Sequence, residues 1–176
     1  MLETYSKKIG QKLKTYRTWL LNWNDKSRKK NKRKFEKSTI EVLKENVFQN
    51  SIENGTADYV ISGFGLKTFN DEQLGKLANE IDRILKPNGK FSLIDVSVPN
   101  SKFLKPFYMF YLKNIIPILG KLFLGSPETY RMLGVYTEEF GNSKNVHRIF
   151  NEQEFEVEYV EYFYGCASGI KGRKTK

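Results

Sequence analysis

The stretch ADYVISGFGLKTFNDEQLGKLANEIDRILKPNGKFSLIDVSVP, residues 57–99, combines the two periodicities that decide the fold. Its first six residues predict a short apolar strand, and residues 71–85 carry apolar side chains at the period of an amphipathic helix. Pro87 cannot continue a helix, so KPNG predicts its end. KFSLIDVSVP (90–99) is apolar at its centre, as is typical of a strand buried on both faces. This strand–helix–strand order predicts an α/β domain with a mainly parallel sheet.

The segments on either side complete the expected architecture. Towards the N-terminus we expect a helix over 3–16, a strand at 18–23, a helix from about 24 to 36 and a strand at 39–47. The C-terminal segment, EFEVEYVEYFYGCASGIKG, alternates and predicts an antiparallel β-hairpin. On this hairpin and just before it, alternate acidic residues are expected to face water: Glu154, Glu156, Glu158 and Glu161.

The segment FLKPFYMFYLKNIIPILGKLFLG (103–125) is the most apolar part of the chain. Three lysines interrupt it, and Pro106 and Pro117 break the pattern further. A transmembrane helix needs about 20 apolar residues without charges. We therefore predict two short amphipathic helices that line a pocket or lie on a membrane surface, with ordinary core helices as the alternative.

Charge and cysteine content limit the class of protein. The 176 residues carry a net charge of +10, and residues 1–37 account for all of it, with 13 Lys or Arg against 3 Asp or Glu. We interpret the run at 26–37 as a solvated helix face. An anionic-lipid patch is the alternative, and nucleic acid is not expected because no base-reading motif accompanies the run. The single cysteine, Cys166, provides no internal disulfide, which favours a cytoplasmic protein.

Candidate ligand-binding residues stand where the predicted strands end, because open parallel sheets bind ligands at their carboxyl edge. They are Asn22, Glu45, Asn46, Gly63 to Lys67 and Asp95. Asn22 offers an amide for a ribose diol, and Asn46 one for an adenine edge. Gly63 and Gly65 allow close approach of a ligand, and Lys67 is expected to place a cation at the mouth of the site. Each residue taken alone is better explained by turn geometry.

Other chemistries find little support in the sequence. The Gly-x-Gly at 63–65 is too short for a dinucleotide fingerprint, and acidic residues open the helix that follows it. The single histidine, His147, is expected to have a surface or packing role rather than to act as a base. No metal-ligand spacing or Ser-His-Asp set is present in the sequence.

Four segments, taken together, resemble the ubiquinone/menaquinone-biosynthesis C-methyltransferases (UbiE-type), a class I S-adenosylmethionine-dependent family. They are NGTADYVISGFGLKTFND (54–71), LKPNGKFSLIDVSVP (85–99), ETYRMLGVYTEEF (128–140) and YGCASGIKGRK (164–174). The resemblance covers about residues 18–174. It implies a Rossmann-like class I methyltransferase sheet, S-adenosyl-L-methionine as cofactor, and methyl transfer to a ring carbon of a quinone-like or other lipophilic small molecule.

The resemblance also implies roles for individual residues. Cofactor contacts are expected from Asn22, Glu45, Asn46, Val47, Gly63, Phe64 and Gly65. Substrate contacts are expected from Lys67, Thr68, Tyr130 and Arg131, with Lys67 the nearest candidate for a catalytic base. Phe64 is expected to pack, and residues 100–150 would form a substrate-side helical insertion. Peripheral membrane contact and a homo-oligomer remain open.

The sequence departs from the family pattern at its beginning. The family's first strand and its Gly-rich loop are absent, so we expect a single partial domain over 1–176 with a basic region at 1–37. We favour an N-terminal truncation. The alternatives are a non-catalytic binding or membrane-surface module and completion of the sheet by a second chain. A sheet without its central strand would expose apolar edges, so we expect poor solubility.

Overall fold

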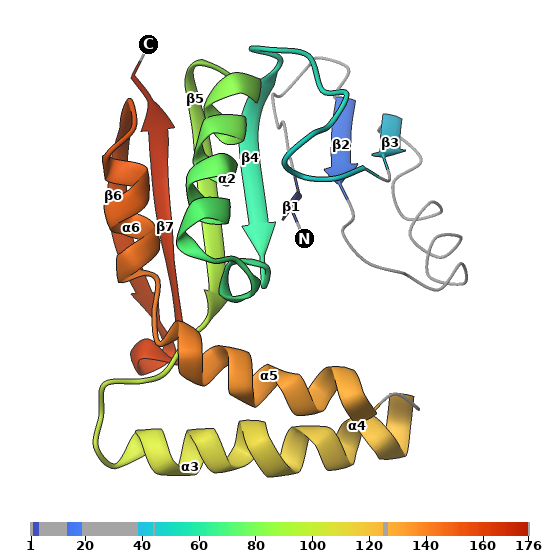
Figure 1. Cartoon of the computed structure of the whole chain (residues 1–176), viewed down its shortest axis with the longest axis vertical. Coiled ribbons are helices and arrows are strands. Elements are labelled where there is room, and N and C mark those ends of the chain that lie inside the picture. The colour runs from blue at the N-terminus through green and yellow to red at the C-terminus, as the bar shows by residue number, and fades with distance from the viewer. Residues whose placement is uncertain (1, 4–13, 19–38, 44, 125–126, 176) are drawn as a thin grey trace.

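The computed structural model describes residues 2–3, 14–18, 39–43, 45–124 and 127–175, which form a seven-stranded sheet with helices (Figure 1). The strand order is β3-β2-β1-β4-β5-β7-β6. The strands are β1 (Leu2–Glu3), β2 (Lys14–Thr18), β3 (Thr39–Leu43), β4 (Ala57–Gly63), β5 (Leu85–Val96), β6 (Phe155–Tyr162) and β7 (Ala167–Lys174). The longer helices are α2 (Asp71–Ile84), α3 (Leu104–Phe110), α4 (Ile116–Leu124), α5 (Pro127–Phe140) and α6 (Lys144–Asn151).

The βαβ unit expected at residues 57–99 is confirmed. Strands β4 and β5 pair in parallel, with Gly63 opposite Ile94, and α2 connects them. Helix α2 begins at a capping box, because the side chains of Asn70 and Gln73 each accept a hydrogen bond from the other residue's backbone N–H. Its apolar side chains lie on one stripe that faces the sheet, as its sequence period predicts.

The C-terminal hairpin is also confirmed. Strand β7 lies between β5 and β6 and pairs antiparallel with both. The acidic residues on the hairpin and the one just before it are exposed as expected, and two of them pair with basic residues across the hairpin: Glu156 with Arg173, and Glu158 with Lys171. The α/β class with a closing antiparallel hairpin therefore agrees with the expectation. The expectation of a mainly parallel sheet is wrong for the described strands, because only β2 with β3 and β4 with β5 pair in parallel, and the other four pairs are antiparallel.

The hydrophobic core lies between the sheet and two helices on one face. Helices α2 and α6 lie side by side in front of β4–β7 (Figure 1), and both contribute buried residues to the core. Its aromatic centre is Phe91, Phe150 and Phe155, whose ring centroids lie 5.0 to 5.9 Å apart. Along the opposite face, where no described helix covers β4–β7, the sheet lines an open depression of about 590 Å³.

The expectations for the N-terminal segment are wrong in part, and in part they lie outside the described residues. The helix expected over 3–16 is wrong at each of its described residues. Glu3 belongs to β1, and Lys14, Thr15 and Tyr16 form part of β2 and pair in parallel with β3. Pairing with a neighbouring strand overrides the local helical spacing there. Most of the expected strand at 18–23 and the whole expected helix at 24–36 lie outside the described residues. Strand β3 occupies only the first part of the segment expected at 39–47.

The expectation of two separate helices in 103–125 is also wrong. Helix α3, the π-helical segment η3 (Tyr111–Ile115) and α4 follow one another without a break from 104 to 124. Pro106 stands in the first turn, where a backbone N–H has no helical partner anyway. Pro117 is the second residue after the π-helical segment, and just before it the Ile116 N–H donates to the Tyr111 carbonyl five residues back. The wider turn accommodates the second proline.

The turn expected at residues 86–89 is formed differently from the expectation, because it lies within β5, where the register with β4 shifts. Asn88, with φ 62°, takes the left-handed conformation, and Gly89 does not. A Cβ at Gly89 would lie 2.8 Å from the Lys86 carbonyl oxygen, so glycine is required there by close approach. The helix ends at Ile84, one residue before the expected end, and β5 begins at once.

Candidate functional site

The carboxyl ends of β4 and β5 lie at the same edge of the sheet, next to the helices α3–α5 (Figure 1). The chain leaves β4 there through residues 63–68, which we call the strand-end corner. The short 3-10 turn η2 (Leu66–Thr68) completes this corner, and helix α5 packs against it. Five of the residues expected in the site, Gly63, Phe64, Gly65, Lys67 and Thr68, are therefore brought together by one turn of the backbone.

Phe64 is the exposed residue of the corner. Its φ of 63° is left-handed, which is uncommon for a bulky residue, and its N–H donates to the Ile94 carbonyl oxygen at 2.8 Å. Its side chain is 63% exposed, so the expectation that it packs is wrong. The hydrogen bond to β5 fixes the backbone in a turn that directs the ring to solvent. Backbone strain of this kind, held by surrounding structure, is common at functional sites.

The two glycines of the corner have different roles. At Gly63, a Cβ would meet no atom within 4 Å, so the protein leaves open space beside the end of β4. Gly65 is buried, and its carbonyl oxygen accepts hydrogen bonds from the Thr68 N–H at 3.3 Å and the Thr68 hydroxyl at 2.7 Å. Gly63 therefore offers room for a ligand, while Gly65 and Thr68 hold the turn together.

Lys67 forms a buried ion pair with Asp95. Its Nζ lies 2.6 Å from Asp95 Oδ1, and the side chains are 6% and 0% exposed. Asp95 also accepts the Lys67 N–H at 3.0 Å and the Val96 N–H at 2.7 Å. The expectation that Lys67 places a cation at the mouth of the site is wrong, because the preference of a buried carboxylate for a charged partner draws the ammonium inward. The pair ties the corner to β5.

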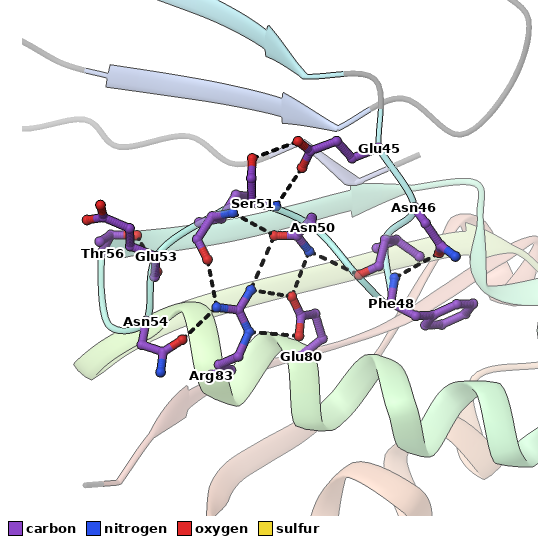
Figure 2. A network of polar contacts seen from close by, with 12 residues as sticks. Glu45, Asn46, Phe48, Asn50, Ser51, Glu53, Asn54, Thr56, Glu80 and Arg83 are labelled. Carbon is purple, nitrogen blue, oxygen red and sulfur yellow. Dashed lines mark hydrogen bonds and ion pairs between the residues drawn. The ribbon is translucent and has the colours of Figure 1, made fainter.

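The turn that follows β3 contains three of the expected cofactor residues. Glu45 accepts hydrogen bonds from the N–H and the hydroxyl of Ser51 at 2.7 and 2.6 Å, and these hold its pKa below the ordinary value (Figure 2). Asn46 is exposed, and its Oδ1 accepts the Phe48 N–H at 3.0 Å. The Val47 side chain is only 2% exposed, so it belongs to the core and leaves only its backbone for ligand contact.

Arg83 anchors this turn to α2 (Figure 2). Its guanidinium donates to the Ile52 carbonyl and the Asn54 side chain, both at 2.6 Å, and to both Glu80 carboxylate oxygens at 2.5 and 2.9 Å. The hydrogen bonds with Glu80 raise the pKa of Arg83. Asn50 donates to Glu80 at 2.6 Å and completes the network. The sequence expectation missed this group, although an arginine in the last turn of a helix beside an Asn-rich loop is a signal for it.

The turn and the corner are linked by an aromatic contact. The ring of Phe48 meets that of Phe69 edge to face, with centroids 5.2 Å apart. Phe48 belongs to the turn and Phe69 directly follows the corner. The two groups of expected cofactor residues are thus parts of one packed assembly.

The remaining expected residues are placed as follows. Asn22 lies outside the described residues. Tyr130 and Arg131 belong to α5, and their side chains are likewise not described. His147 is half-buried in α6, where its backbone N–H donates to the Ser143 carbonyl oxygen. Burial raises the pKa of the Cys166 thiol. Within the described ranges, no group of three or more His, Cys, Asp or Glu residues could hold a metal ion.

Solved structures share this fold at low sequence identity. A S-adenosylmethionine-dependent methyltransferase from Aquifex aeolicus is 18% identical, with a TM-score of 0.55 over 90% of this chain and 68% of that one. Human N-acetylserotonin methyltransferase, solved in complex with S-adenosylmethionine, is 16% identical, with a TM-score of 0.50 over 80% of this chain and 35% of that one. These likenesses show the class I methyltransferase fold.

Sequence comparison identifies the family. The model of the ubiE/COQ5 methyltransferase family matches residues 5–174. The demethylmenaquinone methyltransferase of Lactococcus lactis is 35% identical over 80% of this chain and 55% of its own length, and that of Staphylococcus aureus is 34% identical over 70% and 51%. The chain thus spans about half the length of these curated relatives. On the match across residues 5–174, the chain belongs to the ubiE/COQ5 methyltransferase family.

Proposed function

We propose that this chain serves in methyl transfer from S-adenosyl-L-methionine to a ring carbon of a quinone-like lipophilic molecule. The family match over residues 5–174 carries the proposal, and relatives named demethylmenaquinone methyltransferases support the class of acceptor. The relatives are enzymes, which favours catalysis over the alternative of a non-catalytic module.

The residues of the corner fit one wall of a cofactor site. Gly63 leaves open space at the end of β4, and Phe64 presents an exposed ring beside that space. In the turn after β3, the Asn46 side-chain amide nitrogen makes no hydrogen bond within the described ranges and offers a donor for an adenine edge. S-adenosylmethionine, when bound, supplies an electrophilic methyl group on a sulfonium.

The task of the chain's own residues is to orient the methyl donor and the acceptor and to exclude water from them. We assign Phe64 to the wall that keeps water from the reacting atoms, because its ring is held outward by the hydrogen bond to Ile94. Lys67 is the candidate base that the sequence offers. Its ammonium donates to Asp95 at 2.6 Å and to the Phe64 carbonyl oxygen at 3.4 Å, an arrangement that favours positioning the corner over removing a proton.

The test is calorimetric titration of S-adenosylmethionine into the chain and into two matched variants. Phe64→Ala and Phe163→Ala each remove an exposed phenylalanine with a left-handed φ, 63° and 51°, from different turns. We expect Phe64→Ala to weaken binding by about fivefold or more, the loss of one aromatic contact. Phe163→Ala should bind as the native chain does. Equal binding by both variants, or no binding by the native chain, contradicts the proposal for this chain.

A further inference from the structure

The continuous helix formed by α3, η3 and α4, together with Phe103, projects at the end of the molecule where β4 and β5 finish (Figure 1). We call residues 103–124 the arm. One side of the arm packs against α5 and buries Met109 and Leu112, which are 7% and 4% exposed. A helix that covers its partner on one side normally presents polar residues on the other.

The outer side of the arm is apolar as well. Phe103, Phe107, Phe110, Ile118 and Leu122 are 84, 75, 59, 63 and 72% exposed. Their intervals of four, three, eight and four residues place them on one side of the helix, away from the face buried on α5. Contiguous apolar surface of this kind marks an interaction site, because the hydrophobic effect favours its removal from water.

The charge of the arm is of one sign. The arm contains three lysines, a fourth, Lys102, directly precedes it, and residues 100–124 contain no aspartate or glutamate. Lys113 pairs with Glu138 of α5 at 2.6 Å. Lys102, Lys105 and Lys121 form no ion pair with any carboxylate in the described part of the chain. The surface that the arm offers is therefore both apolar and cationic.

We propose that the arm docks on the surface of an anionic lipid bilayer, with its outer aromatic and aliphatic side chains at the headgroup boundary and its lysines on the lipid phosphates. Large exposed Phe and Leu residues combined with lysines are the composition of helices that lie in a membrane interface. No helix in the described ranges is long and apolar enough to cross a bilayer.

The positive charge of the arm favours an anionic bilayer over a second copy of the chain as its binding partner. Two arms facing each other would bring lysines together with no acidic residue on either arm to offset the repulsion. An anionic headgroup layer supplies the missing negative charge and also receives the apolar side chains.

Docking by the arm would also orient the candidate site. The arm packs on α5, and α5 packs on the η2 turn that contains Lys67. The strand-end corner would thus be held near the bilayer in which a lipophilic acceptor dissolves, a consequence that rests on the proposed function. The docking itself requires neither cofactor nor acceptor.

The test is flotation of the purified 176-residue chain with phosphatidylcholine vesicles, with and without phosphatidylglycerol. Flotation separates vesicle-bound protein from aggregates, which sediment. The native chain should float with the anionic vesicles, less at high salt, and weakly with the neutral ones. The double variant Phe107→Ser/Leu122→Ser should lower the partition coefficient about tenfold or more. Replacing Lys102, Lys105 and Lys121 by Gln should lower it about fivefold for each lysine in contact.

The matched control is Tyr59→Ser/Tyr162→Ser, which replaces two exposed aromatics of the sheet that are 37% and 40% exposed. It should float like the native chain. Circular dichroism checks that each variant is folded. Native chain that does not float, or arm and control variants that float equally, overturns the proposal. If the arm variant leaves flotation unchanged and only converts a native dimer into monomers, the outer side of the arm binds a second copy of the chain, and the proposal is overturned. A chain that floats but does not bind S-adenosylmethionine contradicts the proposed function alone.

Discussion

Helix α2 and the arm are both helical and rich in apolar side chains, but these side chains lie in different environments. The apolar stripe of α2 is buried against the sheet, and its other side carries the exposed residues Asp71, Glu72 and Lys76. The arm buries one apolar side on α5 and exposes a second one. A period of 3.6 residues therefore predicts that a helix forms. The residues on the side opposite the buried stripe indicate whether that side faces water or binds a partner.

The two regions also differ in how they are held. Helix α2 is joined to the rest of the body by the βαβ connection, the Arg83 network and the core shared with α6. The arm is held through α5 and through the Tyr108 hydroxyl, which donates to the Cys166 carbonyl oxygen at 3.0 Å. We therefore expect substitutions in the body to affect stability far more than equivalent substitutions on the outer side of the arm.

The sharpest form of this comparison replaces one phenylalanine in each region. Phe150 of α6 is 0% exposed and stacks with Phe155, whereas Phe107 of the arm is 75% exposed. Phe150→Ala should lower the free energy of unfolding by about 3–5 kcal/mol, the cost of a core cavity. Phe107→Ala should change it by less than about 0.5 kcal/mol. Pulse proteolysis in urea, at low protein concentration, measures both. Similar losses would show that the outer side of the arm is covered within the protein.

The second prediction compares a buried ion pair with an exposed one. Lys67→Met leaves the Asp95 carboxylate buried with only its two backbone donors, which should cost about 3 kcal/mol. Lys86→Met breaks a pair with Asp58 whose side chains are 45% and 44% exposed, which should cost at most about 1 kcal/mol. The same proteolysis assay gives both values. Equal costs would mean that water reaches Asp95 in solution.

The third prediction concerns the beginning of α2. Asn70→Ala removes the side chain that accepts the Gln73 N–H and should lower stability by about 1 kcal/mol. The control, Asn79→Ala, replaces an exposed asparagine within the same helix, and stability should stay the same or rise, because alanine favours the helical interior. If Asn79→Ala proves the more destabilising of the two, the capping box does not stabilise this helix.

Much of the central βαβ unit could be predicted because its determinants are local. Asn70 and Gln73 form the capping box within one turn, and the apolar period of 71–85 needs no knowledge of the sheet. The strand at Lys14–Thr18 could not be predicted in this way, since its pairing with Thr39–Leu43 is a long-range contact. The arm was misjudged because proline was taken to break a helix wherever it stands. Pro106 lies where no N–H is needed, and Pro117 follows a π-helical turn.

The position of the strand-end corner was predicted from the sequence, but its side-chain contacts were not. The strand pattern placed Gly63–Lys67 at the carboxyl end of a strand, and the fold confirms that position. That a ligand binds at this edge stays a prediction. The pairing of Lys67 with Asp95, 28 residues away, depends on the register that sets Gly63 opposite Ile94. The left-handed backbone of Phe64 depends on the same register, through its hydrogen bond to Ile94. If the two neighbouring strands had been assumed to end at the same height in the sheet, the contact between Lys67 and Asp95 could have been predicted from the sequence.

The smallest expected effect concerns the attachment of the arm. Burial, followed by the neighbouring Cys166 and Tyr111, raises the pKa of Tyr108 from 10.0 to about 12. Because the folded state holds this proton more tightly than the unfolded chain, the contribution of Tyr108 is fully present below pH 10 and is lost as the pH rises towards about 12. Tyr108→Phe, which removes the hydrogen bond to Cys166, should therefore cost about 0.5–1.5 kcal/mol at pH 9, and this difference from the native chain should shrink at pH 11.

Urea unfolding followed by circular dichroism at pH 9 and pH 11 measures this difference. The control is Tyr164→Phe, on a ring that is 92% exposed, which should change stability at pH 9 by less than about 0.5 kcal/mol. A Tyr108→Phe difference that stays constant between the two pH values would mean that the hydroxyl is solvated in solution and that the arm is not attached there. In that case the arm would be held to the body through α5 alone, and its position beside the strand-end corner would depend on that one helix.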